Sequence, residues 1–277
     1  MTSLCHSTAV IEDGATLGDG VLIGPYATVG KHVTLGSGTK VGAHAVVEGH
    51  TTLGEDCEVF PHACIGTIPQ DLKYHGEISY LVAGDRNVFR EFVTANVGTE
   101  GGGGVTQVGS DNLFMAYCHL AHDCIIGDHV IFGNAATLAG HVIIEDWVNV
   151  GAFSGVEQFR RVGQHAFVAA YAGATKDVVP YCTVQGNHCQ VFGLNIVGLK
   201  RRGFSAVAIG ELKRAFRLLF RSNLNTTQAL EMISGEDFES PEVAALVEFV
   251  RNSEHGIVKL FSGADRRQHA DALRGGG

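Results

Sequence analysis

Aliphatic residues recur at every sixth position through most of the N-terminal two thirds of the chain. The first series is uninterrupted and consists of Ile11, Leu17, Ile23, Val29, Leu35, Val41, Val47, Leu53, Val59 and Ile65. Glycine follows the aliphatic residue in most of these units, and the fifth residue of each unit is small. The period resumes in a changed phase at Val82 and Val88, and a third series runs from Val108 to Val168.

This six-residue period excludes ordinary helices and isolated strands as its source. A helix places an apolar residue every three or four positions, and a strand places one at every second position. A strict period of six with adjacent glycines is instead the signature of a parallel β-helix. Three hexapeptides then close one triangular coil, and each coil advances the chain by about 4.8 Å. We expect this all-β prism over residues 1–190, while the pattern alone leaves its handedness open.

Two interruptions of the period predict loops that leave the prism. They cover about residues 67–81 (TIPQDLKYHGEISYL) and about residues 99–107, which include four consecutive glycines. Loops on a regular scaffold often carry function, and a tolerated surface insertion is the alternative for each of them.

The pattern becomes helical from about residue 191. Residues 205–222 have a broad apolar stripe with basic residues between, and residues 226–233 predict a second helix. The Ser240-Pro241 pair is a typical start of a third helix. We therefore expect residues 191–277 to form a C-terminal α-helical domain.

Charge and cysteine content narrow the class of protein. The net charge of −9 argues against a general nucleic-acid or membrane-surface binder. No apolar run approaches the roughly 18 to 20 residues of a membrane span, and the start lacks the features of a signal peptide, so we expect a cytoplasmic protein. The seven cysteines are odd in number and lack C-x-x-C spacing, which predicts reduced thiols, mostly in the core.

Candidate chemistry lies in the stretch LAHDCIIGDHVIFGNAATLAGH. A coil of three hexapeptides stacks residues 122, 140 and 158 in one column and residues 123, 141 and 159 in the next. His122 beside Asp123 has the composition of a general base whose tautomer a carboxylate fixes. Adjacent side chains on a strand point to opposite faces, so whether Asp123 orients His122 stays open. The Gly140 N–H is a candidate oxyanion donor for acyl transfer.

Two other functions are compatible with parts of this pattern. His119, His122 and His141 suggest a zinc site like that of carbonic-anhydrase-like hexapeptide proteins, although His119 occupies a different position within its unit. A non-enzymatic solenoid would explain the repeats. It would not explain two polar insertions and a basic helical region.

Several motifs together resemble one family. VGSDNLFMAYCHLAHDC, LAGH, QGNH, GLNIVGLKRRGFS and QDLKY are similar, in order and over nearly the whole chain, to the UDP-N-acetylglucosamine O-acyltransferase family. The resemblance implies a left-handed β-helix that works as a homotrimer with active sites between subunits. It implies transfer of an (R)-3-hydroxyacyl chain from acyl carrier protein to UDP-N-acetylglucosamine, the first step of lipid A synthesis, without metal or cofactor.

The resemblance also assigns roles to residues. It implies that His122 is the general base, Asp123 its polarising partner and Gly140 the oxyanion donor. The implied substrate-binding residues are Asp71, Lys73, His119, His141, Gln158, His188, Asn195 and Arg201. Ala170, with Phe167 and Tyr171 nearby, matches the position that limits acyl-chain length, and its methyl group suggests a chain shorter than the longest used.

Three positions depart from the family pattern. Glu157 stands where members often have histidine, Val97 where they have arginine, and Val197 where they have glutamate. We hypothesise that the Glu157 carboxylate favours a cationic 3-amino sugar over the 3-hydroxy sugar. The related N-acyltransferase carries a further domain before its repeats, whereas the repeats here begin at Ile11, which favours the O-acyltransferase.

Basic residues concentrate in the predicted helical domain. Seven of the twenty Lys and Arg residues are Lys200, Arg201, Arg202, Lys213, Arg214, Arg217 and Arg221. On an acidic protein such a cluster suits an acidic partner, such as acyl carrier protein, and the alternative is a solvated helix face.

Overall fold

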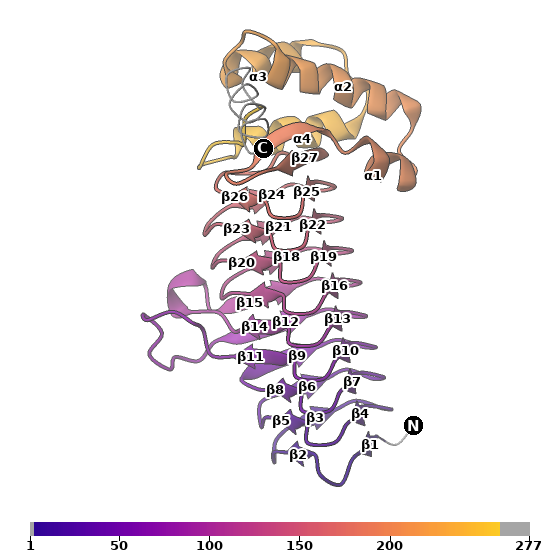
Figure 1. The fold of residues 1–277 in the computed structure, drawn as a ribbon, viewed down its shortest axis with the longest axis vertical. Coiled ribbons are helices and arrows are strands. Elements are labelled where there is room, and N and C mark those ends of the chain that lie inside the picture. The colour runs from indigo at the N-terminus through magenta and orange to yellow at the C-terminus, as the bar shows by residue number, and fades with distance from the viewer. Residues whose placement is uncertain (1–2, 261–277) are drawn as a thin grey trace, which may run out of the picture.

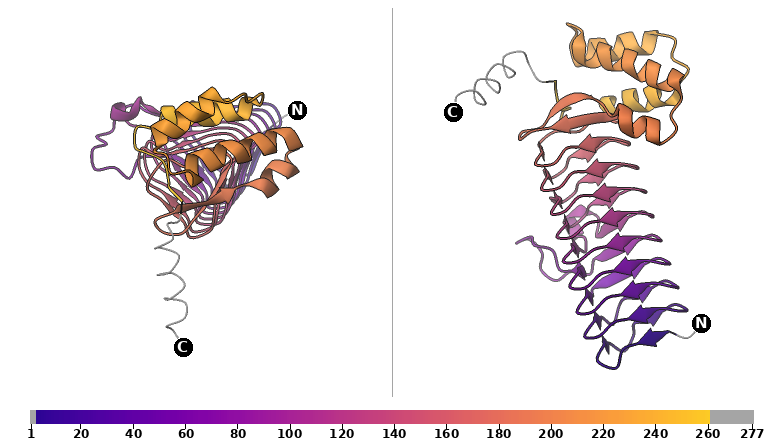
Figure 2. Two further views of the ribbon diagram at one scale, coloured as in Figure 1. Left: turned by 90° about the horizontal axis from the view of Figure 1, so that it is seen from above. Right: turned by 45° about the vertical axis from the view of Figure 1, so that its right-hand side comes forward.

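The chain forms a triangular prism of short parallel strands with helices across its C-terminal end (Figure 1). The computed structural model describes residues 3–260. Seen from above, the stacked coils form a triangle that the helices cover (Figure 2). Within the described residues, no helix is long and apolar enough to cross a membrane.

Three sheets form the faces of the prism, and we name them A, B and C. Sheet A consists of β1 (Leu4–Cys5), β4 (Leu22–Ile23), β7 (Lys40–Val41), β10 (Glu58–Val59), β13 (Val88–Phe89), β16 (Leu113–Phe114), β19 (Ile131–Phe132), β22 (Asn149–Val150), β25 (Phe167–Val168), β27 (Cys182–Gln185) and β28 (Gln190–Leu194). Sheet B consists of β2 (Val10–Ile11), β5 (Thr28–Val29), β8 (Val46–Val47), β11 (Cys64–Thr67), β14 (Thr94–Asn96), β17 (His119–Leu120), β20 (Thr137–Leu138), β23 (Gly155–Val156) and β26 (Gly173–Ala174). Sheet C consists of β3 (Thr16–Leu17), β6 (Thr34–Leu35), β9 (His50–Leu53), β12 (Tyr80–Ala83), β15 (Val105–Val108), β18 (Ile125–Ile126), β21 (Ile143–Ile144) and β24 (Arg161–Val162).

The six-residue series forms the core. Neighbouring strands pair in parallel between equivalent residues of successive coils, as in His119 with Thr137. The second residue of each two-residue strand points inward, and those from Ile23 to Ile65 and from Val108 to Val168 are buried. The predicted phase at Val82 and Val88 is wrong, because the side chain of Val82 is 44% exposed. Leu81 and Ala83 on β12 and Phe89 on β13 fill the core instead.

Backbone geometry at the corners decides where the polar side chains lie. One residue in most turns is left-handed, with φ between 52° and 66° in residues other than glycine. The corner between sheets B and C carries Asp123, His141 and Phe159, each on its own coil. The corner between sheets C and A carries Trp147, His165 and Tyr181, among others. These residues stack in columns along the prism, as the ring distance of 4.5 Å between His141 and Phe159 illustrates.

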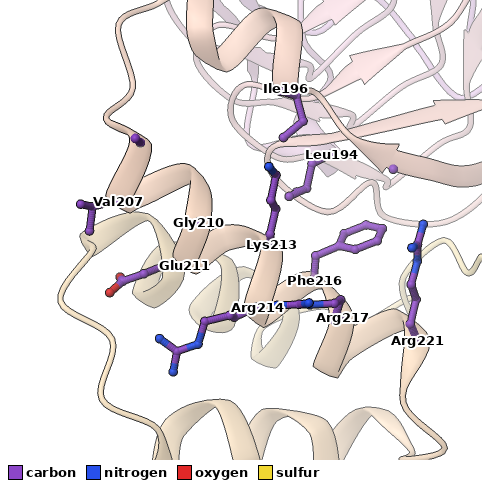
Figure 3. A pocket seen from close by; sticks show the side chains of 12 residues that line it. Leu194, Ile196, Val207, Gly210, Glu211, Lys213, Arg214, Phe216, Arg217 and Arg221 are labelled. Atoms are coloured by element: carbon purple, nitrogen blue, oxygen red, sulfur yellow. The ribbon is translucent and has the colours of Figure 1, made fainter.

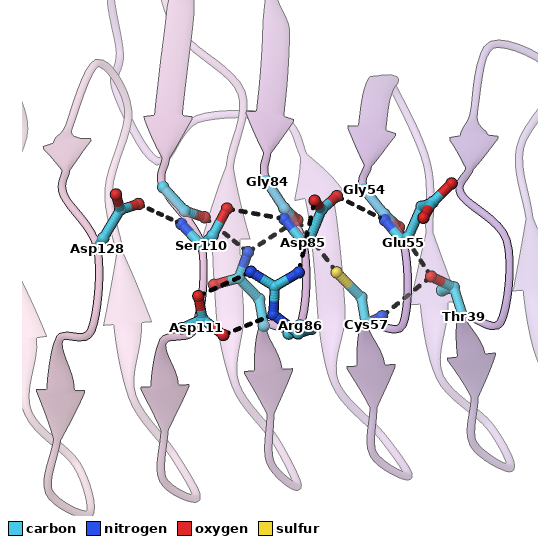
Figure 4. Close-up of polar contacts among 12 residues, drawn as sticks. Thr39, Gly54, Glu55, Cys57, Gly84, Asp85, Arg86, Ser110, Asp111 and Asp128 are labelled. Atoms are coloured by element: carbon cyan, nitrogen blue, oxygen red, sulfur yellow. Dashed lines mark hydrogen bonds and ion pairs between the residues drawn. The ribbon is translucent and has the colours of Figure 1, made fainter.

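A polar ladder holds the coils together at the corner between sheets C and A (Figure 4). The Thr39 hydroxyl donates to the Gly54 carbonyl at 2.9 Å, and the Cys57 thiol donates to the Gly84 carbonyl at 3.2 Å. The pKa of the Cys57 thiol is raised by burial. Cys57, Cys118, Cys124, Cys182 and Cys189 are buried free thiols, whereas Cys5 is exposed and Cys64 half-buried.

Two segments leave the prism on the same side (Figure 1). The first insertion, residues 68–79, joins β11 to β12, and the second insertion, residues 97–104, joins β14 to β15 and contains η1 (Glu100–Gly102). Strands begin inside both predicted loop ranges, because β12 pairs with β15 over all four residues.

Within the part of the chain that the structure describes, four helices follow the prism. They are α1 (Ile196–Arg201), α2 (Ala206–Arg221), α3 (Thr226–Gly235) and α4 (Pro241–Arg251). Ser205 caps α2 by accepting from the Ala208 N–H, and Asn225 and Gln228 form a capping box at α3. The helices share a core with the last coil. Residues 261–277 of the predicted helical domain lie outside the described residues.

Candidate active site

The corner between sheets B and C brings His122, Asp123 and His141 together. The His122 Nδ1–H donates to Asp123 Oδ2 at 2.8 Å, and His141 Nε2 lies 3.8 Å from the same oxygen. The two histidine rings meet edge to face at 5.0 Å. Asp123 has φ 59°, and this turn lets the side chains of two adjacent residues meet, which settles the geometry that the sequence left open.

The Asp123 carboxylate is buried and fully hydrogen-bonded. Its side chain is 1% exposed. The Thr99 N–H donates to Oδ1 at 2.8 Å, and the Thr99 hydroxyl donates to Oδ2 at 2.6 Å. The Asp123 N–H in turn donates to the Thr106 hydroxyl at 2.8 Å. Reasoning from the sequence missed both threonines, because they lie in or after the aperiodic second insertion.

The first insertion reaches the other side of His122. Asp71 Oδ2 lies 3.7 Å from His122 Nε2. The Lys73 N–H donates to Asp71 Oδ1 at 2.9 Å, and this bond is the main reason that the pKa of Asp71 lies below its ordinary value. The adjacent His122 and Lys73 lower the pKa of Asp71 further. His122 therefore lies between two carboxylates, one on each ring nitrogen.

Gly140 packs directly against the imidazole of His122. A Cβ at this position would lie 2.5 Å from His122 Cε1 and 2.7 Å from Nε2. The neighbouring residues use their N–H groups between coils, as His141 does with the His122 carbonyl at 3.1 Å. Among the described residues, no backbone carbonyl accepts from the Gly140 N–H.

Two hollows meet at this corner. A groove of about 500 Å³ runs over sheet B and is lined by His119, His122, Thr137, Gly140, Gly155, Glu157 and Gly173, among others. A second cavity of about 660 Å³ lies between the two insertions and the corner, and its lining is mostly polar: Asp71, Lys73, His75, Glu77, Thr99, Glu100, Gly101, His141, Gln158 and Phe159. The first has a floor rich in glycine and apolar side chains, so the two suit different parts of a ligand.

The three histidines do not form the predicted zinc set. The described residues contain one cluster with metal-ligand spacing, His122, Asp123 and His141, whose ligand atoms lie within 4.8 Å of one another. His119 Nδ1 is hydrogen-bonded to the Thr94 hydroxyl at 2.8 Å instead. Burial lowers the pKa of both His119 and His141, and for His141 it outweighs the opposite effect of Asp123.

Glu157 and Gln158 lie on different sides of the corner. Glu157 lines the groove, and Arg160 Nη2 donates to its carboxylate at 2.9 Å. Arg160 also donates to the Thr175 carbonyl at 2.9 Å. The carboxylate thus has a cationic partner within the chain. Gln158 lines the polar cavity with His141.

The other predicted site residues lie away from His122 within one chain. Asn195 donates to the His165 carbonyl at 3.0 Å, at the corner between sheets C and A. Arg201 is exposed at the end of α1, and His188 is exposed in the turn between β27 and β28. Phe167 points out of sheet A with a side chain 37% exposed, and Ala170 is exposed in the turn from sheet A to sheet B.

The two hydrophobic departures differ in environment. Val97 is 2% exposed at the start of the second insertion, where its N–H donates to the Thr67 carbonyl at 3.1 Å. Val197 is 62% exposed on α1. Val97 is a core residue, and Val197 presents an apolar surface.

A further hollow of about 760 Å³ lies beside α2 (Figure 3). Lys213, Arg214, Arg217 and Arg221 line it together with the apolar side chains of Leu194, Ile196, Val207 and Phe216. Arg214 pairs with Glu236 at 2.6 Å. Four of the seven residues of the predicted basic cluster therefore line an apolar depression.

The sequence matches two family models and many individual proteins. Residues 14–49 and 106–140 match bacterial transferase hexapeptide repeats, and residues 177–258 match domain 2 of UDP-N-acetylglucosamine O-acyltransferase. The chain is 52% identical to the acyl-[acyl-carrier-protein]–UDP-N-acetylglucosamine O-acyltransferase of Anaeromyxobacter dehalogenans strain 2CP-1, over 92% of this chain and 99% of that protein. The chain belongs to this acyltransferase family.

Other members of the acyltransferase family agree in sequence and fold. The enzyme of the same name from Herminiimonas arsenicoxydans is 48% identical over 93% of this chain and 100% of its own length. The structure of LpxA from Acinetobacter baumannii superposes with a TM-score of 0.90 and 42% identity, over 92% of this chain and all of that one. The Francisella novicida UDP-N-acetylglucosamine acyltransferase gives a TM-score of 0.90 at 37% identity, over 92% of this chain and 94% of that one.

Family membership confirms three predictions from the sequence: the acyltransferase motifs, the left-handed parallel β-helix and the helices that follow it. The interpretation as a non-enzymatic solenoid is wrong.

Proposed function

We propose that this acyltransferase moves an (R)-3-hydroxyacyl chain from acyl carrier protein to the 3-position of UDP-N-acetylglucosamine, the first step of lipid A synthesis. One observation carries the proposal: His122 lies where an apolar groove meets a polar cavity, and its Nδ1–H is fixed by a buried carboxylate at 2.8 Å. Fixing the proton on Nδ1 leaves Nε2 as the acceptor, the state that a general base needs. The sequence similarity supports the same reaction.

The proposed chemistry is a proton-balanced acyl transfer. His122 Nε2 takes the proton of the sugar hydroxyl, and the hydroxyl oxygen attacks the thioester carbonyl carbon. The C–O bond forms, the carbonyl electron pair moves to its oxygen, and the Gly140 N–H donates to the oxyanion. When the C–S bond breaks, the imidazolium returns the proton to the leaving thiolate. Two observations support this assignment: among the described residues no backbone carbonyl accepts from the Gly140 N–H, and His122 Nδ1 is hydrogen-bonded to Asp123.

The two hollows suit the two substrates. The polar cavity holds Asp71, Lys73, His141 and Gln158, which offer both charged and neutral hydrogen-bonding groups to a nucleotide sugar. The groove over sheet B has a glycine-rich floor along which an acyl chain can lie, with His119 beside it. We therefore propose the sugar on the insertion side and the acyl chain on the sheet B side.

A second subunit is proposed to complete the site. Asn195 lies at the corner between sheets C and A, whereas His122 lies at the corner between sheets B and C. The two residues therefore lie at different corners of one prism. We propose that Asn195, Arg201 and His188 act on the site of a neighbouring copy within a homotrimer, in line with cyclic assemblies of identical subunits.

Acyl carrier protein is the proposed protein partner of the helices. The depression beside α2 combines four basic side chains with an apolar floor, and acyl carrier protein is acidic. We also propose a cytoplasmic location, with which the buried free thiols agree.

The candidate specificity residues are Ala170, Phe167 and Glu157. We propose that Ala170 and Phe167 limit the acyl chain, Phe167 from the neighbouring copy because it points out of sheet A. The hypothesis from the sequence is that Glu157 favours the 3-amino analogue of the sugar. Its ion pair with Arg160 supplies the cation from within the chain, which favours the 3-hydroxy sugar.

One assay tests these proposals. The purified protein is given acyl carrier protein thioesters of several chain lengths with UDP-N-acetylglucosamine or its 3-amino-3-deoxy analogue. We expect acyl transfer to the 3-hydroxyl and loss of nearly all turnover in His122→Ala. Near-wild-type turnover in His122→Ala would show that the base is misassigned. Clear preference for the amino sugar would favour the alternative substrate.

A further inference from the structure

The second insertion closes over the carboxylate that orients the base. Thr99 of this insertion is buried and hydrogen-bonds to Asp123, and Gly102 of η1 packs beside the same carboxylate. We propose that Thr99 and Gly102 are positioning residues: together they hold the Asp123 carboxylate in the one place from which it fixes the tautomer and orientation of His122. This inference deepens the proposed function and rests on it.

Thr99 supplies what a buried carboxylate requires. A charge whose side chain is only 1% exposed needs hydrogen-bond donors to replace water. Thr99 provides two donors from one residue, its N–H to Oδ1 at 2.8 Å and its hydroxyl to Oδ2 at 2.6 Å. Both oxygens of Asp123 are thereby fixed, and His122 meets Oδ2 at 2.8 Å. The carboxylate cannot rotate without losing these bonds.

Gly102 supplies the space. A Cβ on Gly102 would lie 2.1 Å from Asp123 Cγ and within 2.5 Å of both carboxylate oxygens. The Gly102 N–H donates to the Thr99 carbonyl at 3.0 Å, which brings the backbone of η1 against the carboxylate. Any side chain here must displace either Asp123 or the turn. Gly101, the preceding residue, has no atom within 4 Å of its Cβ position.

The insertion also lines the polar cavity of the site and contacts the first insertion. Thr99, Glu100 and Gly101 line the polar cavity, and the Glu100 N–H donates to Glu77 of the first insertion at 3.4 Å. Within the glycine run, Gly102 is thus the residue that packs closely over the Asp123 carboxylate. This explains why a segment without periodicity interrupts the prism one coil before His122.

Substitution of Thr99 separates positioning from binding. Thr99→Val removes the hydroxyl donor and keeps the shape. Because a hydrogen bond to a charged group is lost, we expect kcat to fall about 10- to 100-fold. The KM values for both substrates should change little, since Thr99 acts through Asp123. Thr99→Ser retains the hydroxyl and should restore kcat. Equal losses in Thr99→Ser and Thr99→Val would overturn the proposal.

The glycine pair provides a matched control. Gly102→Ala should lower kcat, whereas Gly101→Ala adds a methyl group to the polar cavity without touching Asp123 and should raise the KM for the nucleotide sugar rather than lower kcat. In an Asp123→Ala background, Thr99→Val and Gly102→Ala should cause no further loss, because the group that they position is gone. Additive losses in that background would contradict the inference.

The proposed base and the proposed positioning role can be refuted separately. If His122→Ala retains turnover, the proposed base is wrong. If His122→Ala is inactive while Thr99→Val and Gly102→Ala have wild-type kcat, only the positioning role is wrong.

Discussion

Gly140→Ala gives the sharpest test of the catalytic geometry. The backbone of Gly140 has no left-handed φ, so alanine is tolerated by the chain itself. The added Cβ would lie 2.5 Å from His122 Cε1, whereas carbon atoms pack at about 3.5 to 4.0 Å. The imidazole must therefore move by about 1 Å. It cannot do so freely, because Asp123 holds Nδ1 at 2.8 Å and His141 meets the ring from its edge.

A displacement of this size is expected to be costly for catalysis. A misplacement of about 1 Å in a catalytic group lowers the rate by about 10²-fold, or about 2.7 kcal/mol of barrier. The Gly140 N–H is retained in the variant, so the loss reports on the base and not on the oxyanion donor.

Steady-state kinetics with acyl carrier protein thioester can check this prediction. We expect kcat to fall and KM to change little. Gly155→Ala is the control, because it adds the same methyl group to the groove one coil away, where no atom lies within 4 Å of the Cβ position. It should affect KM for the acyl donor rather than kcat. A wild-type kcat in Gly140→Ala would show that the close packing on His122 has no catalytic importance.

Three further predictions concern stability and metal. Phe114→Ala removes the middle ring of the core stack with Phe89 and Phe132, at ring distances of 5.1 and 5.2 Å, and should lower the free energy of unfolding by about 3 to 5 kcal/mol in urea titrations. Phe92→Ala, on the exposed corner, should cost less, and an equal cost would contradict this account of the core. Burial, followed by Arg202, lowers the pKa of His165 from 6.5 to about 4. As the pH drops from 6.5 towards 4, the unfolded chain takes up a proton at His165 before the folded chain does, so the free energy of unfolding should fall. His165→Gln should therefore lose less stability than the wild type between pH 7 and 5. An identical pH dependence in the variant would refute that assignment. Treatment with EDTA should leave acyl transfer unchanged, and activity lost to EDTA and restored by zinc would revive the metal alternative.

The regular part of the molecule could be predicted from sequence because its register is fixed by backbone hydrogen bonds. Residues of successive coils pair one to one, so the repeat alone placed Gly140 over His122. The same reasoning failed at Val82, where Leu81, Val82 and Ala83 are all apolar and the insertion had changed the phase. Only pairing with β9 and β15 decides that Val82 points outward.

The irregular part could not be predicted, for reasons that the contacts explain. The contact of Asp123 with His122 depends on one left-handed residue at a corner, which the residue type does not dictate. Thr99 reaches Asp123 across 24 positions of sequence through an aperiodic turn. The position of Asn195 at another corner follows from how the chain returns after β28, which no local pattern contains.

The groove over sheet B is built from one position of successive coils: His119, Thr137, Gly155 and Gly173 pair in order along the sheet. For a ligand that lies along this column, the length that fits is set in steps of one coil, about 4.8 Å. Gain or loss of a coil would change the length of this column by one coil. A side chain at Gly155 or Gly173 would change the length that fits by less than one coil. Evolution of ligand length can therefore proceed on this prism by coarse and fine adjustments that are independent of each other.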